Sequence, residues 1–297
     1  MPTLTIFTPT YNRAHTLGRT YHSLSMQTSR DFEWIVVDDG STDNTRALVE
    51  SFMAEGKISI RYIHKENGGL YTGYNTAYAN ATGELCCCVD SDDFMPMDAV
   101  ATIIDTRRQR GSDRYAGVLG LDFDAATGQP LGGYFPKDID ECWFADLYIR
   151  GIHRADTKEA LRTALMREVA PQTGFPDEKN FNPVYMQLQV CDRYPLLVVN
   201  RNLCNVEYQT GGDSMSAGIW HQYADSPRSF AKLRKLELTL RHNTPLNRVR
   251  CAIHYVASCI LARDRRWLAD SPRRLLTIVV FPAGLLLWLL ILYKTRR

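Results

Sequence analysis

One stretch near residue 90 constrains the fold more than any other part of the chain. Five apolar residues, Leu85–Val89, are followed within four positions by three aspartates, Asp90, Asp92 and Asp93. A short, uninterrupted apolar run is typical of a strand that is buried on both faces, as in a parallel sheet. Such sheets bind ligands beyond the carboxyl ends of their strands, which is where these aspartates lie. The stretch therefore predicts an α/β sheet with a ligand site at this edge.

The crowding of the three carboxylates indicates a cation. Like charges this close raise one another's pKa, so a proton or a divalent cation must relieve them. A site made only of oxygen ligands suits Mg²⁺ or Mn²⁺, and a cation held there would bind a diphosphate. The alternative from these residues alone is a helix N-terminus that an aspartate caps, with Pro96 in its first turn.

Strands and helices alternate through the first ninety residues. The predicted strands are Leu4–Thr8, Phe32–Val37, a run around Ile58–Tyr62 near a sheet edge, and Leu85–Val89; the predicted helices follow Asn12, follow Ser41, and cover roughly Tyr71–Asn80. We expect Asn12 and Ser41 to cap the first two helices. The alternation predicts right-handed crossovers and a largely parallel sheet. The glycine patterns of a dinucleotide-binding turn and of a P-loop are both missing, which disfavours those sites.

Three blocks at the carboxyl ends of these strands resemble glycosyltransferase family 2. They are Thr8–Arg13, Val36–Asp43 and Asp90–Asp93, and they occur in the family's order and at about its separations. Members of this family are inverting enzymes with nucleotide-sugar donors and the GT-A fold, a Rossmann-like, mostly parallel central sheet flanked by helices. The resemblance covers about residues 1–125. It implies a metal-dependent, hexosyltransferase-type enzyme with a UDP-sugar as the expected donor.

The resemblance also assigns roles to individual residues. Those expected along the nucleotide are Thr8, Pro9, Tyr11, Asp39, Asp90 and Ser91. Among them, Tyr11 would stack on the base, Asp39 would accept a hydrogen bond from a uracil N3–H, and Asp90 would contact the ribose. Asp92 would bind the Mn²⁺ or Mg²⁺ that bridges the diphosphate, and Asp38 is expected to be structural.

One segment departs from the family pattern. Many relatives carry a cation in the segment that corresponds to Asn67–Asn75, where this chain has no Lys or Arg. The diphosphate must then rely on the metal, on backbone N–H groups, or on a basic residue from elsewhere in the chain.

We expect residues 126–225 to form the acceptor half of a catalytic domain that covers residues 1–225. Inverting transfer needs a carboxylate that takes the proton of the attacking hydroxyl. Glu178 is the first candidate and Asp177 the second, in a block that resembles the family's Pro-x-Glu-Lys-Phe; the family's usual Glu aligns with Pro183. The alternative is a surface turn. A helix is predicted to begin in Asp156–Thr163, and residues 211–216 resemble the loop that closes over the donor.

The C-terminal residues 226–297 are basic and contain a long apolar run. Twelve Lys and Arg against three acids lie between Arg228 and Arg274, whereas the first 227 residues are acidic, which argues against nucleic acid as a partner. Two amphipathic helices are predicted, followed by nineteen uncharged residues, Leu275–Tyr293. Because Pro282 and Gly284 interrupt this run, in-plane or re-entrant attachment is favoured over a spanning helix.

These features predict an enzyme at the cytoplasmic face of the inner membrane. It would transfer one sugar to a lipid-linked, polyprenyl-diphosphate saccharide in the synthesis of a bacterial surface polysaccharide such as capsule or lipopolysaccharide. The alternative is a membrane-attached sensor or scaffold that binds a sugar nucleotide without turnover, which the missing cation at residues 67–75 and the displaced catalytic base both favour.

Overall fold

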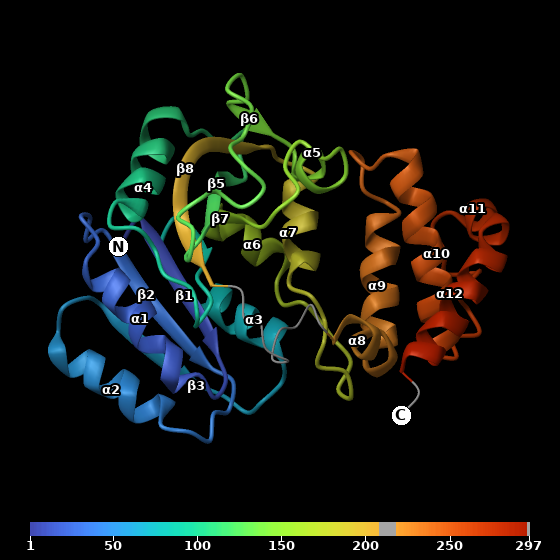
Figure 1. Cartoon of the computed structure of the whole chain (residues 1–297), viewed down its shortest axis with the longest axis horizontal. Helices are drawn as coiled ribbons and strands as arrows, with labels where there is room; N and C mark the ends of the chain where they lie inside the picture. Colours follow the sequence, from blue (N-terminus) through green and yellow to red (C-terminus); the bar gives the residue numbers. More distant parts are fainter. Residues whose placement is uncertain (208–217, 296–297) are drawn as a thin grey trace. The chain divides into compact units, whose positions relative to one another are not determined.

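The computed structural model of the chain describes residues 1–207 and 218–295 (Figure 1). Its contacts divide the chain into two units, Met1–Pro171 with Val190–Tyr208, and Gln172–Gln189 with Gln209–Arg297. This division differs from the predicted boundary after residue 225, because residues 172–189 belong with the C-terminal helices.

A mixed eight-stranded sheet forms the first unit, with the strands in the order β3-β2-β1-β4-β7-β5-β8-β6. The strands are β1 Leu4–Thr10, β2 Phe32–Asp38, β3 Ile60–His64, β4 Leu85–Cys88, β5 Gly117–Asp124, β6 Glu141–Cys142, β7 Thr157–Arg162 and β8 Leu196–Val206. Strands β1 to β4 are parallel, and β3 lies at the edge. The predicted α/β sheet of four parallel N-terminal strands is therefore confirmed.

Helices cover both faces of this sheet. The helices of the first unit are α1 Ala14–Ser25, α2 Thr45–Glu55, α3 Leu70–Asn80, α4 Ala99–Arg110, α5 Phe144–Tyr148 and α6 Thr163–Val169, and α7 Val184–Cys191 joins the two units. Side chains of α1, α2 and α4 share one apolar core with alternate strand residues such as Trp34. On the opposite face, Phe7 of β1 contacts Tyr74 and Tyr78 of α3 edge to face, at centroid distances of 5.0 and 5.4 Å.

The sheet contains a strand where a helix was predicted. Residues 157–162 form β7, which pairs antiparallel with both β4 and β5, and helix α6 begins only at Thr163. The segment Lys158–Arg162 consists of strong helix formers, which is why the prediction is wrong. Burial between two strands overrides that local preference, since Lys158, Ala160 and Leu161 are all buried.

Five helices form the core of the second unit. They are α8 Ile219–Asp225, α9 Pro227–Glu237, α10 Pro245–Leu261, α11 Arg274–Val279 and α12 Phe281–Lys294. Helices α9 and α10 correspond to the two predicted amphipathic helices. Helix α12 packs closely on α10, because a Cβ atom on Gly284 would lie 2.5 Å from Cγ1 of Val256.

The apolar run 275–293 is divided into two helices. Helix α11 ends at Val279, and Pro282 lies in the first turn of α12, where a proline is tolerated. Within the described residues, every helix is too short or too polar to cross a membrane. A spanning helix is therefore not supported.

Candidate active site

The loops that follow β1 and β2 are held together by hydrogen bonds. The N–H of Asn12 donates to Oγ of Ser41 at 2.9 Å. The carboxylate of Asp43 accepts from the N–H of Ala14 and from the N–H of Thr45, both at 3.0 Å, so one residue serves the first turns of α1 and α2. The caps predicted at Asn12 and Ser41 are therefore wrong, because both residues join the two loops instead.

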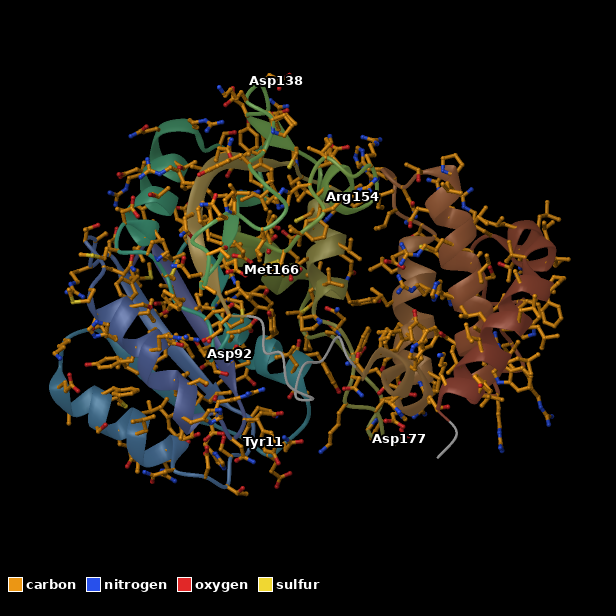
Figure 2. All side chains as sticks on the ribbon, viewed as in Figure 1. Tyr11, Asp92, Asp138, Arg154, Met166 and Asp177 are labelled. Atoms are coloured by element: carbon orange, nitrogen blue, oxygen red, sulfur yellow. The ribbon has the colours of Figure 1, made fainter. Side chains whose placement is uncertain are left out.

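Three residues expected along a nucleotide base lie at the end of β1. Thr8 is buried and accepts a hydrogen bond from Nε1 of Trp34 at 2.9 Å. Pro9 packs on α3, where a Cβ atom on Gly73 would lie 3.1 Å from Cβ of Pro9. Tyr11 is 49% exposed, and Figure 2 shows it at the same end of the sheet as Asp92. The Tyr11 ring is thus accessible for stacking.

Asp39, at the end of β2, is buried and already bonded by the protein. Its two carboxylate oxygens accept from the N–H groups of Gly68 and Gly69 at 3.0 and 2.9 Å, and the ammonium of Lys65 pairs with it. These donors precede α3. Lys65 is a cation just outside the segment 67–75 that lacks one, and its contact with Asp39, the residue that follows β2, could not be seen in the sequence. A nucleotide base would compete with these donors for Asp39.

Helix α1 holds the acidic loop that follows β4. Oγ1 of Thr20 donates to the carbonyl of Asp93 at 2.8 Å, and the guanidinium of Arg19 donates to the carbonyl of Asp92. The same guanidinium lies 4.9 Å from the ring centroid of Phe94. The guanidinium also pairs with Glu207, so Arg19 ties the acidic loop to α1 while its charge is shared with that carboxylate. The sequence shows Arg19 only as one polar position of an amphipathic helix.

The three clustered carboxylates differ in their surroundings. Asp93 is buried and lies 3.7 Å from Nζ of Lys158. In the part of the chain that the structure describes, no Lys, Arg or His nitrogen lies within 4 Å of the carboxylate of Asp90, which is exposed, or of Asp92. Two carboxylates therefore lack a protein cation, and Ser91 between them is buried.

This donor set fits a hard divalent cation that is shared with a ligand. No group of three or more His, Cys, Asp or Glu side chains among the described residues could hold a metal alone. Mg²⁺ is commonly held by one or two carboxylates together with substrate phosphates and water, and Asp90 and Asp92 match that pattern.

A buried charge cluster lies behind the acidic loop. Nζ of Lys158 lies 3.7 Å from Oδ2 of Asp93 and 3.9 Å from Oδ1 of Asp122. Burial raises the pKa of Asp93 to about 7 and the pKa of Asp122 to about 6, an effect that the ammonium of Lys158 opposes. Two carboxylates thus compete for one ammonium. The cluster was missed because the strand that carries Lys158 was predicted to be helical.

The two candidate catalytic bases lie in the second unit. Glu178 is only 3% exposed, and its carboxylate accepts from Nε of Arg228 at 2.9 Å and from the N–H groups of Arg228 and Ser229 at 3.0 and 2.7 Å. Asp177 is exposed, and its pKa lies below the ordinary value because Arg228 donates to it. Glu178 therefore anchors the first turn of α9, and its role as a base stays a prediction. Residues 211–216 lie outside the described residues.

The anchoring contacts of Glu178 make a testable prediction. Glu178→Gln should lower the free energy of unfolding by about 2–4 kcal/mol, because the buried ion pair and the anion at the first turn of α9 are both lost. Thermal unfolding measures this change. Asp177→Asn is the matched control and should change stability by less than about 1 kcal/mol, since its ion pair is exposed. An unchanged midpoint for Glu178→Gln, together with lost turnover, would instead favour a purely catalytic role.

Comparisons with known sequences support the family resemblance. Residues 5–132 match the model described as glycosyl transferase family 2. The putative teichuronic acid biosynthesis glycosyltransferase TuaG of Bacillus subtilis (strain 168) is 24% identical over 228 residues, which cover 74% of this chain and 83% of that protein. Several other curated glycosyltransferases match at 31–37% identity, and the chain spans 14–41% of their length.

Solved structures with the same fold include two nucleotide-sugar complexes. S. aureus TarS 1–349 in complex with UDP-GlcNAc has a TM-score of 0.65 at 19% identity, covering 99% of this chain and 80% of that chain. Mannosyltransferase PcManGT from Pyrobaculum calidifontis, in complex with GDP-Man and Mn²⁺, has a TM-score of 0.56 at 16% identity, covering 99% and 88%. The likeness supports the predicted GT-A-type fold. The match over residues 5–132 shows that this part of the chain is similar to glycosyltransferase family 2, as the resemblance of its sequence blocks predicts.

Proposed function

We propose that the chain is an inverting, metal-dependent glycosyltransferase that moves one sugar from a UDP-sugar to a saccharide acceptor. The observation that carries this proposal is the edge at which β1, β2 and β4 end together, with the exposed ring of Tyr11 and two carboxylates, Asp90 and Asp92, that lack a protein cation. Support comes from the nucleotide-sugar complexes of two structures with the same fold, one of which contains Mn²⁺.

The residues of this edge would contact different parts of the nucleotide-sugar donor. Tyr11 would stack on the base, and Thr8 and Pro9 would support the loop beneath it. Asp90 and Ser91 would face the ribose side, and Asp92 would hold Mn²⁺ or Mg²⁺. The cation, when bound, neutralises charge on the leaving diphosphate. Arg19 stands beside the same loop, and it would have to exchange its ion pair with Glu207 for a phosphate to replace the cation missing from the segment 67–75.

The chemical step is a displacement with inversion. The acceptor hydroxyl oxygen forms a bond to the anomeric carbon while the bond from that carbon to the diphosphate oxygen breaks, and a carboxylate takes the hydroxyl proton. Glu178 is proposed for that carboxylate, with Asp177 second. Either residue would have to exchange its contact with Arg228 for the acceptor.

A panel of UDP-sugars tests the proposal. Each is incubated with the full chain and Mn²⁺, and released UDP is measured with and without EDTA. We expect slow hydrolysis of at least one UDP-sugar that EDTA abolishes. Absence of hydrolysis and of transfer with every donor would contradict the proposal.

A sugar-nucleotide sensor or scaffold is the second candidate. The observation that favours it is that Asp39 and Glu178 already have protein partners for their carboxylates. Calorimetry separates the two functions, because a sensor would bind UDP without turnover of any UDP-sugar.

We further propose that the acceptor is lipid-linked and that the second unit attaches the enzyme to the cytoplasmic face of the inner membrane. Apolar side chains of α11 and α12 are exposed, among them Leu275 (82%), Val279 (75%) and Leu286 (67%). Arg274 begins α11 and Lys294 ends α12. An apolar surface with cations at its ends suits an anionic leaflet, where each nearby basic residue adds about 1 kcal/mol.

Membrane attachment predicts an effect of substitutions on these two helices. The double variant Val279→Glu with Leu286→Glu should weaken binding to phosphatidylglycerol vesicles roughly tenfold or more, because apolar contacts are replaced by negative charge. Co-sedimentation measures the bound fraction. Met53→Glu, on α2 of the other unit, is the control for an exposed apolar side chain and should bind like the wild type. Equal binding of the double variant would contradict this attachment.

A further inference from the structure

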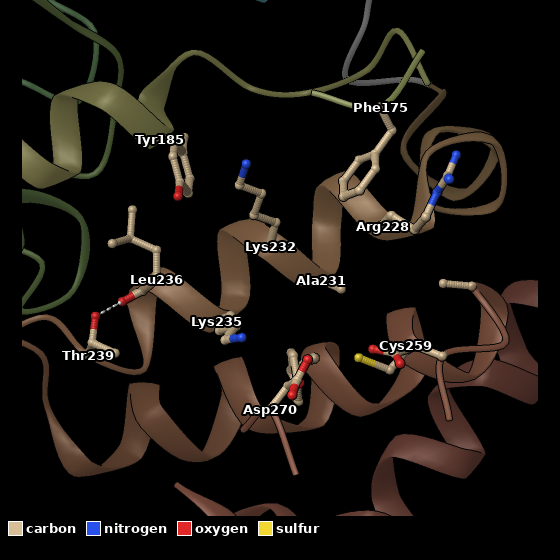
Figure 3. Close-up of a pocket in the computed structure, with 13 residues that line it drawn as sticks. Phe175, Tyr185, Arg228, Ala231, Lys232, Lys235, Leu236, Thr239, Cys259 and Asp270 are labelled. Atoms are coloured by element: carbon tan, nitrogen blue, oxygen red, sulfur yellow. Dashed lines mark hydrogen bonds between the residues drawn. The ribbon is translucent and has the colours of Figure 1, made fainter. Parts of the chain in front are cut away.

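The second unit contains a pocket that the proposed transfer chemistry does not use. Its volume is about 730 Å³, within the range of roughly 300–1,000 Å³ that is usual for ligand sites. Helix α9 contributes Lys232, Lys235 and Leu236 to the lining, and Tyr255 of α10 also lines the pocket. Figure 3 shows Lys232 on the side of Tyr185 and Lys235 on the side of Asp270.

The charges of this pocket are not balanced. Arg228, at one end, is paired with Asp177 and Glu178. Asp270 is paired with Arg266 at 3.2 Å, and Asp264, the other lining carboxylate, accepts from the N–H of Arg266 at 2.8 Å. Lys232 and Lys235, by contrast, have no carboxylate within 4 Å among residues 1–207 and 218–295. Two ammonium groups one turn apart on α9 therefore have no carboxylate partner among these residues, although Lys232 donates to Thr173.

The two lysines differ in their surroundings. Nζ of Lys232 donates to the carbonyl of Thr173 at 2.6 Å and lies 5.6 Å from the ring centroids of Phe181 and Tyr185. Burial lowers the pKa of Lys232. Lys235 is exposed. Lys235 is therefore the more exposed of the two ammonium groups and Lys232 the more buried.

The rest of the lining is mainly apolar. It includes aromatic rings and small aliphatic side chains, namely Phe175, Tyr185, Ala231, Leu236, Tyr255 and Ala262. A free inorganic anion would make no contact with these apolar side chains. An anion attached to an apolar chain would use both the lysines and the rings.

We propose that this pocket binds a phosphate or diphosphate carried on an apolar chain, with the anion at Lys232 and Lys235 and the chain along the rings. The inference rests on the proposed function, in which the acceptor saccharide is linked to a polyprenyl diphosphate. It assigns the recognition of that carrier to the second unit, in a pocket formed wholly by residues of that unit.

Calorimetry with farnesyl diphosphate tests the pocket directly. The full chain is titrated in EDTA, so that the acidic loop of the first unit has no metal for a diphosphate. We expect farnesyl diphosphate to bind at least tenfold more tightly than either inorganic diphosphate or farnesol. Equal affinity for inorganic diphosphate would overturn the role of the chain, and equal affinity for farnesol would overturn the role of the lysines.

Three variants locate the binding. Lys235→Met should weaken the affinity for farnesyl diphosphate roughly tenfold, as expected for one charged contact. Ala231→Trp should abolish binding by filling the pocket, while an unchanged unfolding midpoint shows that the fold is kept. Arg250→Met, an exposed cation on α10 outside the pocket, is the control and should bind like the wild type. Full affinity in Lys235→Met or Ala231→Trp would overturn the proposal.

The outcome is separable from that of the proposed function. Hydrolysis of UDP-sugars depends on the first unit and needs no lipid. If the chain hydrolyses a UDP-sugar but does not bind farnesyl diphosphate, the proposed transferase function stands and the proposed lipid pocket is wrong. If the chain binds farnesyl diphosphate but hydrolyses no UDP-sugar, the proposed lipid pocket stands and the proposed transferase function is wrong.

Discussion

Replacing Asp92 with alanine is expected to lower turnover of a UDP-sugar roughly a hundredfold or more, because a direct ligand of the proposed cation is removed. Asp92 and its neighbour Asp90 are the carboxylates of the acidic loop without a protein cation among the described residues, whereas Asp93 pairs with Lys158. Asp90, the other carboxylate without a protein cation, is expected at the ribose and not at the cation. Initial rates of UDP release at several Mn²⁺ concentrations measure the effect.

The control for this substitution lies on α4. Asp105→Ala removes an exposed carboxylate of the same unit and should leave the rate unchanged. Thermal unfolding of the Asp92→Ala variant should show a midpoint at or above that of the wild type, since repulsion between two carboxylates is relieved. Turnover of Asp92→Ala at the rate of Asp105→Ala would refute the metal site.

Lys158→Met should lower the free energy of unfolding by about 3–5 kcal/mol, because it removes the ammonium that two buried carboxylates face. Denaturant unfolding measures this loss. Turnover should fall as well, since Asp93 directly follows the proposed metal ligand and its position depends on Lys158. A variant as stable as the wild type would show that the charge cluster does not hold the acidic loop.

Asp122→Asn is the matched control for Lys158→Met, and comparing it with the wild type also tests how the free energy of unfolding depends on pH. One carboxylate still faces Lys158, so the variant should lose much less stability than Lys158→Met. The pKa of Asp122 is raised from its ordinary 3.8 to about 6, so folding takes up a proton between these values. The corresponding stability is present below about pH 4 and is lost as the pH rises through about 6. The wild type should therefore lose stability relative to Asp122→Asn over this range.

The parts of the fold that the sequence predicts are those with strong local patterns. Strand β4 is a continuous apolar run, and β1 and β2 are rich in β-branched and aromatic residues. The order of these strands along the chain implies parallel neighbours whose ends meet. Strand β7 was missed because its pairing with β4 and β5 is a tertiary effect that outweighs the helix propensity of its residues.

Site residues, too, could be predicted where a local sequence pattern marks them and not where only tertiary contacts do. Tyr11, Asp39 and Asp92 could be named because each stands in a short block directly after a strand. Arg19 and Lys65 could not, since each reaches the site across the fold from a helix face or a strand end. Glu178 was assigned as a base from its block, and only its contacts with α9 reveal the structural role.

The most direct test of the central claim is calorimetric titration of the full chain with UDP in the presence of Mn²⁺. If the loops after β1, β2 and β4 form one nucleotide site, the wild type binds UDP at a single site, EDTA weakens the binding strongly, and both Tyr11→Ala and Asp92→Ala reduce it. Absence of UDP binding with either Mn²⁺ or Mg²⁺, or binding that neither substitution changes, would contradict the account.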